Sequence, residues 1–121
     1  MSWPVWVGVA LLGGVGANAR FLVHSLVLKR SRSGFPLATL VVNVSGSLLL
    51  GLITGLALSG DALVLAGSAT LGSYTTFSTW MLDTHRLAEG ARRGPAILNV
   101  LISLGVGLGA VALGRLVGRA F

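Results

Sequence analysis

The sequence contains no cysteine and very few acidic residues. Without cysteine, the chain has no disulfide framework, no thiolate nucleophile and no thiolate metal site. Its three acidic residues, Asp61, Asp83 and Glu89, all lie outside the middle of the long apolar runs. The two histidines are no more central, because His24 lies near the end of such a run and His85 lies between two of them. Proton-coupled export normally needs a titratable group within the membrane, and hydrolysis needs a base, a nucleophile and an orienting group. The sequence therefore predicts a conduit without a chemical step, and not an enzyme.

Charged residues are also scarce, at 10% of the 121 residues, whereas apolar residues make up 54%. This composition excludes a typical soluble domain and indicates that the chain folds in a lipid bilayer. The net charge of +6 would also suit a nucleic-acid partner. However, the basic residues lie mainly between or at the ends of apolar runs, as membrane-flanking charges do.

Four apolar segments have the length of a membrane span. A bilayer core of about 30 Å requires roughly 20 helical residues, and the candidate spans cover about residues 5–28, 37–58, 62–81 and 96–117. We expect the first to be a retained span and not a signal peptide, because no basic residue precedes it. The sequence predicts an all-α membrane protein with a single four-helix transmembrane domain over residues 1–121.

The links between these spans carry most of the positive charge. Two of the three links lie on one face of the membrane and hold six basic residues, Lys29, Arg30, Arg32, Arg86, Arg92 and Arg93. The opposite face has Arg115 and Arg119 near the C-terminus. The positive-inside rule predicts that these two links are cytoplasmic and that both termini lie outside. The compact four-span form suits a bacterial inner membrane.

The third span is polar in the part where an ordinary span would carry leucine. Residues 72–80 include five hydroxyl-bearing Ser and Thr side chains together with Gly72. Irregular backbone at membrane depth is tolerated only inside protein, where it lines a cavity or holds an ion. We therefore predict a break in the third helix and place the functional site there. The alternative is a polar helix end at the membrane surface.

Polar side chains also recur at helical spacing on two other spans. Thr39, Asn43 and Ser47 share one face of the second span, and Asn99 and Ser103 repeat that spacing on the fourth. Such residues either join helices through hydrogen bonds or line a pore. For the serines alone the first interpretation is favoured, because serine can bond to its own helix backbone.

One cation and two glycine pairs complete the features within the spans. Arg20 either faces a wet cavity or extends to the interface. The pairs Gly51-xxx-Gly55 and Gly105-xxx-Gly109 favour close helix association and together predict a tightly packed oligomer.

The polar groups of the spans also indicate which ions they could bind. Hydroxyl and amide hydrogens and the positive edges of aromatic rings suit a small anion, while carbonyls exposed at a helix break suit a hard cation such as Na⁺. The residues alone predict a small-anion pathway with a structural cation, without choosing the anion.

Three motifs in this order resemble the CrcB/Fluc family of fluoride channels across nearly the whole chain. The first is Gly14-x-Gly16-Ala17-x-x-Arg20, the second is Thr39-x-x-x-Asn43-x-x-Gly46, and the third is Gly72-x-x-Thr75-Thr76-Phe77-Ser78-Thr79. The third motif is the most specific. The resemblance implies an antiparallel, dual-topology dimer with two pores, through which fluoride leaves the cytoplasm passively and its toxicity is relieved.

The resemblance also implies roles for individual residues. Phe77 would present its ring edge to the anion, and Asn43 would donate a hydrogen bond beside it. The carbonyls of Gly72 and Thr75 would hold one Na⁺ shared between the subunits. The remaining implied residues of the pore and its vestibule are Ser78, Thr79, Thr39, Asn99, Ser103 and Arg20.

The chain departs from the family pattern in two respects. Trp80 stands where the family typically has a second phenylalanine. The resemblance therefore does not establish a role in the pore for Trp80. The charge bias of the links is also larger than dual-topology insertion expects, and this favours one half of a heterodimer with an oppositely oriented paralogue. The three intact motifs favour a homodimer. Two other functions stay open: a small proton-coupled multidrug exporter, which would need an acid in the first span, and a structural subunit of a membrane complex.

Overall fold

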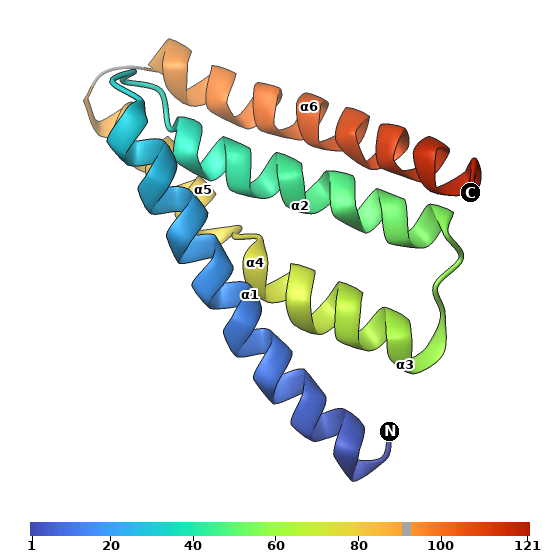
Figure 1. Cartoon of the computed structure of the whole chain (residues 1–121). Coiled ribbons are helices and arrows are strands. Elements are labelled where there is room, and N and C mark those ends of the chain that lie inside the picture. The colour runs from blue at the N-terminus through green and yellow to red at the C-terminus, as the bar shows by residue number, and fades with distance from the viewer. Residues whose placement is uncertain (91–92) are drawn as a thin grey trace.

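The computed structural model describes residues 1–90 and 93–121, which form helices joined by short links (Figure 1). Within these residues, three helices are long and apolar enough to cross a membrane: α1 (Trp3–Arg30), α2 (Leu37–Gly55) and α6 (Arg93–Arg119). They correspond to the first, second and fourth predicted spans, although α1 and α6 are longer than predicted and α2 ends before residue 58. The predicted all-helical class is confirmed.

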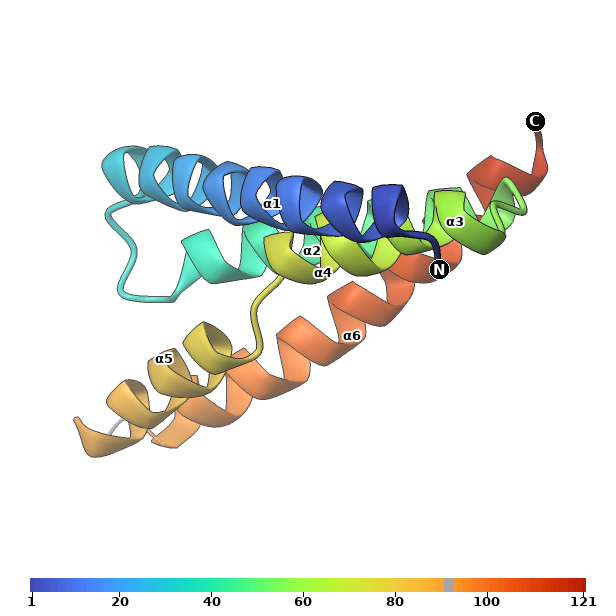
Figure 2. The ribbon, with the colours of Figure 1, turned by 90° about the horizontal axis from the view of Figure 1, so that it is seen from below.

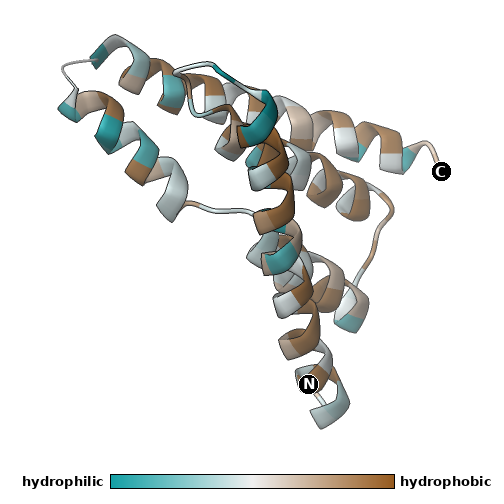
Figure 3. Cartoon of the chain, turned by 60° about the vertical axis from the view of Figure 1, so that its left-hand side comes forward, coloured by the Kyte–Doolittle hydropathy of each residue, from teal (hydrophilic) through white to brown (hydrophobic). Residues whose placement is uncertain are grey.

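The third predicted span is a series of short helical pieces. The chain forms α3 (Gly60–Leu63), the π-helix η1 (Val64–Leu71) and α4 (Gly72–Tyr74), and resumes after residues 75–77 as α5 (Ser78–Glu89). The predicted break within residues 72–80 is confirmed. The helix after the break continues to Glu89, beyond residue 81, where the sequence analysis ended the third span. In Figure 3, α5 carries many hydrophilic positions, whereas the long helices are largely hydrophobic, and hydropathy alone therefore ends the apolar run before the helix ends. The structure thus has three continuous candidate spans and one interrupted segment.

The widened turns of η1 precede the break directly. The N–H of Gly72 donates to the carbonyl of Gly67, five residues back, as a π-helix requires. The hydroxyl of Thr70 donates to the carbonyl of Leu65 over the same separation, at 2.7 Å. π-Helical turns are rare and occur frequently at functional sites. The segment therefore departs from regular α-helix well before it breaks.

The break carries the chain from one pair of helices to another. Helices η1 and α4 pack along α1, whereas α5 packs along α6 (Figure 2). Helix α2 packs closely against α6 and also contacts α1 and η1. Gly16 of α1 makes room for α4, because a Cβ atom there would collide with Ser73 Oγ and the Thr70 carbonyl. The interrupted segment is therefore held between α1 on one side and α2 and α6 on the other.

Reciprocal glycines bring α2 and α6 together. A Cβ atom at Gly51 or Gly55 would collide with the backbone of α6, and one at Gly114 or Gly118 would collide with the backbone of α2. The pair Gly51-xxx-Gly55 thus joins two helices of the same chain, so the prediction that it contributes to an oligomer has lost its basis. The other predicted pair differs, as Gly105 and Gly109 have no heavy atom within 4 Å of a Cβ position among the described residues.

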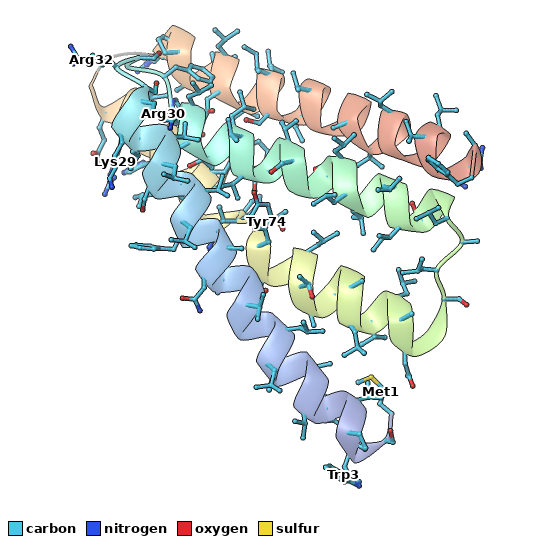
Figure 4. The ribbon with its side chains drawn as sticks, in the orientation of Figure 1. Met1, Trp3, Lys29, Arg30, Arg32 and Tyr74 are labelled. Atoms are coloured by element: carbon cyan, nitrogen blue, oxygen red, sulfur yellow. The ribbon has the colours of Figure 1, made fainter. Side chains whose placement is uncertain are left out.

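The two basic links lie at the same end of the molecule. Figure 4 places Lys29, Arg30 and Arg32 at that end, and Met1 and Trp3 at the far end of α1. The end of α5 and the start of α6 lie beside the first link, and the C-terminus lies away from it (Figure 1). This arrangement agrees with the predicted placement of the two links on one face. Arg92 lies outside the described residues.

Candidate functional site

Asn43 of α2 bonds twice to the backbone of the broken segment. Its amide nitrogen Nδ2 donates to the Thr76 carbonyl at 2.8 Å, and its Oδ1 accepts from the Thr76 N–H at 2.8 Å. The reverse orientation of the amide would place donor against donor, so this pattern fixes the side chain. Thr76 is buried, and a buried backbone group without a partner is costly. Asn43 thus supplies the partners that the interrupted helix lacks, and its second Nδ2 hydrogen remains free of this pair.

Two carbonyls at the break lose their regular helical donors. In a continuous helix, the carbonyl of Gly72 would accept from the N–H of Thr76, and that of Thr75 from the N–H of Thr79. Here the Thr76 N–H donates to Asn43, and the Thr79 N–H donates to the hydroxyl of Thr76 at 3.1 Å. Gly72 and Thr75, the two predicted Na⁺ ligands, are therefore among the residues whose carbonyls lose their helical donors at the break. This chemistry fits a hard cation, which prefers oxygen ligands.

Arg20 of α1 approaches the break. Its Nη1 donates to the Thr75 carbonyl at 3.5 Å, which is the outer limit of a hydrogen bond, and the side chain is half-buried. The structure therefore directs this cation at the broken segment, and the placement of Arg20 in a wet cavity stays a prediction. A guanidinium here supplies positive charge beside the break.

A groove of about 580 Å³ opens beside the break, between α2 and η1. Its walls combine an apolar end with hydroxyl, amide and aromatic groups, and they are formed by Asn43, Gly46, Ser47, Leu50, Thr54, Leu63, Gly67, Ser68, Leu71, Gly72, Thr75, Thr76, Phe77 and Trp80. Gly46 permits this close approach, because a Cβ atom there would collide with the Thr75 methyl group. The groove brings together five predicted site residues: Asn43, Phe77, Trp80, Gly72 and Thr75.

The two aromatic residues of the groove meet edge to face. The ring centroids of Phe77 and Trp80 are 5.7 Å apart, with an interplanar angle of 87°. Phe77 is 69% exposed, so packing within this chain does not account for its position. Trp80 is more constrained, because its indole N–H donates to the Asn99 carbonyl at 3.4 Å. The indole hydrogen that would otherwise be a pore donor is therefore directed at α6.

The other predicted site residues lie outside the described groove lining. Asn99 is buried and donates from Nδ2 to the Thr84 hydroxyl at 2.9 Å, which joins α5 to α6. Thr39 is also buried and donates to the carboxylate of Asp83 at 2.7 Å. The hydroxyls of Ser78 and Thr79 lie within 3.4 and 3.1 Å of the Thr76 hydroxyl. The remaining two are Ser103, which is half-buried on α6, and Arg20.

Three contributors to the site were missed by the sequence reasoning. Thr76 had no predicted role of its own, yet its carbonyl and N–H make both bonds with Asn43, and its hydroxyl accepts from the Thr79 N–H in the first turn of α5. Asp83 and Thr84 fell in or beside a region interpreted as a link, whereas both lie inside α5 and contact other helices. The available signal was their spacing, because Trp80, Asp83 and Thr84 fall at helical intervals.

The fold and the groove define a multi-pass membrane protein whose interrupted helix presents polar groups at an open face. Among known proteins, the chain matches the family described as "CrcB-like protein, Camphor Resistance (CrcB)" over residues 7–115. The chain belongs to this family.

Curated relatives extend the similarity over nearly the full length. The chain is 53% identical to a protein of Mycolicibacterium paratuberculosis named fluoride-specific ion channel FluC 2, over 92% of this chain and 91% of that protein. Symbiobacterium thermophilum has two relatives: FluC 1 is 46% identical over 98% of both chains, and FluC 2 is 44% identical over 89% of this chain and 92% of its own length.

Proposed function

We propose that this protein is a fluoride-selective channel through which fluoride leaves the cytoplasm down its electrochemical gradient. The observation that supports this proposal most directly is the groove at the helix break, where an amide, hydroxyls and an exposed phenyl ring lie close together beside Arg20. Membership of a family whose curated relatives are named fluoride-specific ion channels supports the choice of fluoride.

The groove residues have chemistry that suits a small, strongly hydrated anion. The second Nδ2 hydrogen of Asn43 is available as a donor, since only one is used on Thr76. The edge of the Phe77 ring carries partial positive charge and remains exposed. Ser78 and Thr79 would continue the polar path with their hydroxyls. Trp80 would contribute its ring alone, because its N–H is engaged by Asn99.

Proton-coupled export is a weaker proposal. None of the described residues that line the groove is an aspartate, glutamate, histidine or lysine. Coupling to protons requires a group that changes its protonation in the transport path. The first span also contains no acidic residue. Passive conduction needs neither feature.

The open face of the groove supports assembly as an antiparallel dimer in a bacterial inner membrane. Phe77 and Ser78 at the break are exposed in the single chain, and broken backbone is not tolerated against lipid. A second subunit of opposite orientation would cover this face and complete two pores. The three intact motifs favour a homodimer, while the two named relatives in one organism keep a paired, unlike partner as an alternative.

Fluoride efflux from liposomes that contain this chain alone tests the function and the self-sufficiency together. We expect rapid fluoride loss with little chloride loss. If neither ion is lost, the same assay with an oppositely charge-biased family member distinguishes a missing partner from a wrong function. Equal loss of chloride would contradict fluoride selectivity.

A Na⁺ ion at the dimer interface is the second part of the proposal. The carbonyls of Gly72 and Thr75 would be its ligands from each subunit, since the break removes their helical donors. A Na⁺ at Thr75 would share that carbonyl with the Arg20 guanidinium or displace it. We expect the melting temperature of the detergent-solubilised protein to fall when Na⁺ is replaced by N-methyl-D-glucamine at equal ionic strength. An unchanged melting temperature would argue against the ion.

A further inference from the structure

A second groove lies at the link end of α1, away from the helix break. It has a volume of about 480 Å³ and is lined by Val23, Leu26, Val27, Arg30, Ser31 and Leu37. It forms where α1 ends at Arg30, the backbone becomes extended at Ser31, and Leu37 begins α2. Four of its six lining residues are aliphatic, and its single cation and single hydroxyl lie together at one end. The groove thus has an apolar body and a polar mouth.

The length of α1 places this mouth at the level of lipid headgroups. With 28 residues, the helix is about 42 Å long, whereas the hydrocarbon core is about 30 Å thick. Trp3 and Trp6 at its start are exposed and suit the opposite interface. About 20 residues beyond Trp6, the helix reaches Leu26, so Arg30 emerges among the headgroups while Val23 remains at acyl-chain depth.

The charged residues next to the mouth on α1 and on the link after it are all basic. Lys29, Arg30 and Arg32 lie together at this end of the molecule (Figure 4). Of the three acidic side chains, Asp61 lies in α3 at the other end of the molecule (Figure 1). The two nearer this end already have partners, since Asp83 accepts a hydrogen bond from Thr39 and Glu89 pairs with His85 at 2.8 Å. The cluster therefore attracts an external anion.

We propose that this groove binds one anionic phospholipid of the leaflet that faces the links. One acyl chain lies along Val23, Leu26 and Val27, and the lipid phosphate accepts hydrogen bonds from Arg30. A soluble phosphate would gain nothing from the aliphatic walls, whereas a lipid matches the apolar body and the cationic mouth at once. The site is separate from the groove at the break and does not depend on which ion the protein conducts.

Native mass spectrometry of the detergent-solubilised full-length chain tests the site. The protein is incubated with phosphatidylglycerol or with phosphatidylcholine of the same acyl chains, and the retained lipid is counted. We expect preferential retention of phosphatidylglycerol, and a loss of about fivefold in affinity for Arg30→Gln, as removal of one cation near a membrane surface implies. Arg119→Gln, which removes an exposed arginine at the opposite end of the molecule, is the matched control and should retain the lipid.

A second variant separates a lipid site from general charge attraction. Leu26→Trp fills the apolar body without changing charge, and Leu26 is exposed, so the fold is preserved. We expect reduced retention in this variant as well. Equal retention by the wild type, Arg30→Gln and Leu26→Trp would overturn the proposal, and so would equal binding of the two lipids. Because the chain has no cysteine, Leu26→Cys provides a further check: efficient disulfide formation between copies in the membrane would show that a second copy occupies the groove instead.

Discussion

The α2–α6 pair and the interrupted segment satisfy their backbone hydrogen-bonding groups in opposite ways. Both must satisfy backbone groups in a medium without water. Helices α2 and α6 retain their regular bonds and use glycines to bring two backbones into contact. At the interrupted segment, bonds are lost between Tyr74 and Ser78 and are replaced by side chains, principally Asn43. The comparison shows that the α2–α6 pair is the scaffold. The broken segment lacks some regular helical hydrogen bonds, and this leaves polar groups available at the groove.

The largest effect is expected from filling the contact between α2 and α6. Gly114→Leu places a side chain against the Leu48 carbonyl and the Leu52 amide, where only backbone movement could accommodate it. We expect the loss of monodisperse protein in size-exclusion chromatography and of any ion flux. Gly13→Leu on α1 is the control, because its Cβ position has open space and it belongs to neither predicted association pair. Normal folding of Gly114→Leu would show that this contact is not the scaffold.

Breaking the Asn43 contact should destabilise the other region and stop conduction. Asn43→Leu leaves the buried N–H and carbonyl of Thr76 without partners, at a cost of about 1–3 kcal/mol for each group. We expect faster amide hydrogen exchange confined to the break, a lower melting temperature and no fluoride flux. Asn43→Asp should also fail, because its carboxylate faces the Thr76 carbonyl and repels the anion.

The neighbouring Ser47 supplies the control for this prediction. It lies one helical turn further along α2 and lines the same groove. Ser47→Ala should leave hydrogen exchange at the break unchanged. If Asn43→Leu also left exchange and flux unchanged, the amide would be neither the support of the break nor part of the pathway.

Phe77 should affect function without affecting either structural region. The side chain is 69% exposed in the single chain, so Phe77→Ile removes little internal packing. It does remove the polarised ring edge. We expect an unchanged melting temperature and elution volume, with fluoride flux from liposomes abolished. Leu82→Ile is a suitable control, since it also alters an exposed apolar residue on the segment after the break. Wild-type flux in Phe77→Ile would remove the ring from the mechanism.

The sequence predicted the regular region better than the irregular one. Long apolar runs defined α1, α2 and α6, and a cluster of hydroxyls located the break. The apolar run ends near residue 81 because the hydrophilic residues beyond it, among them Asp83 and Arg86, lower the hydropathy that defines spans, whereas α5 continues to Glu89. Yet these residues are compatible with a helix that packs on α6 and buries Leu87. Hydropathy reports exposure to lipid and does not report helix length.

The candidate site was predicted in outline, because helical spacing identifies which side chains share a face. It does not identify what they meet. The face with Thr39, Asn43 and Ser47 was predicted, but their partners were not, because Asp83 and Thr76 reach them only through the tertiary fold. For the same reason, Gly51-xxx-Gly55 indicated close packing without revealing that α6 of the same chain is its partner.

Trp80 provides the smallest and most discriminating test of the comparison, because it belongs to both regions. It lines the groove, yet its indole N–H is bonded to the Asn99 carbonyl of the scaffold at 3.4 Å. Trp80→Phe keeps an aromatic edge near Phe77 and loses that long hydrogen bond, which is worth about 0.5–1.5 kcal/mol. We expect a small decrease in melting temperature and retained fluoride flux. Trp6→Phe, at an exposed position near the start of α1, is the matched control and should change neither property. Loss of flux in Trp80→Phe at unchanged stability would mean that the indole acts on the anion and that its bond to α6 does not keep it out of the pathway.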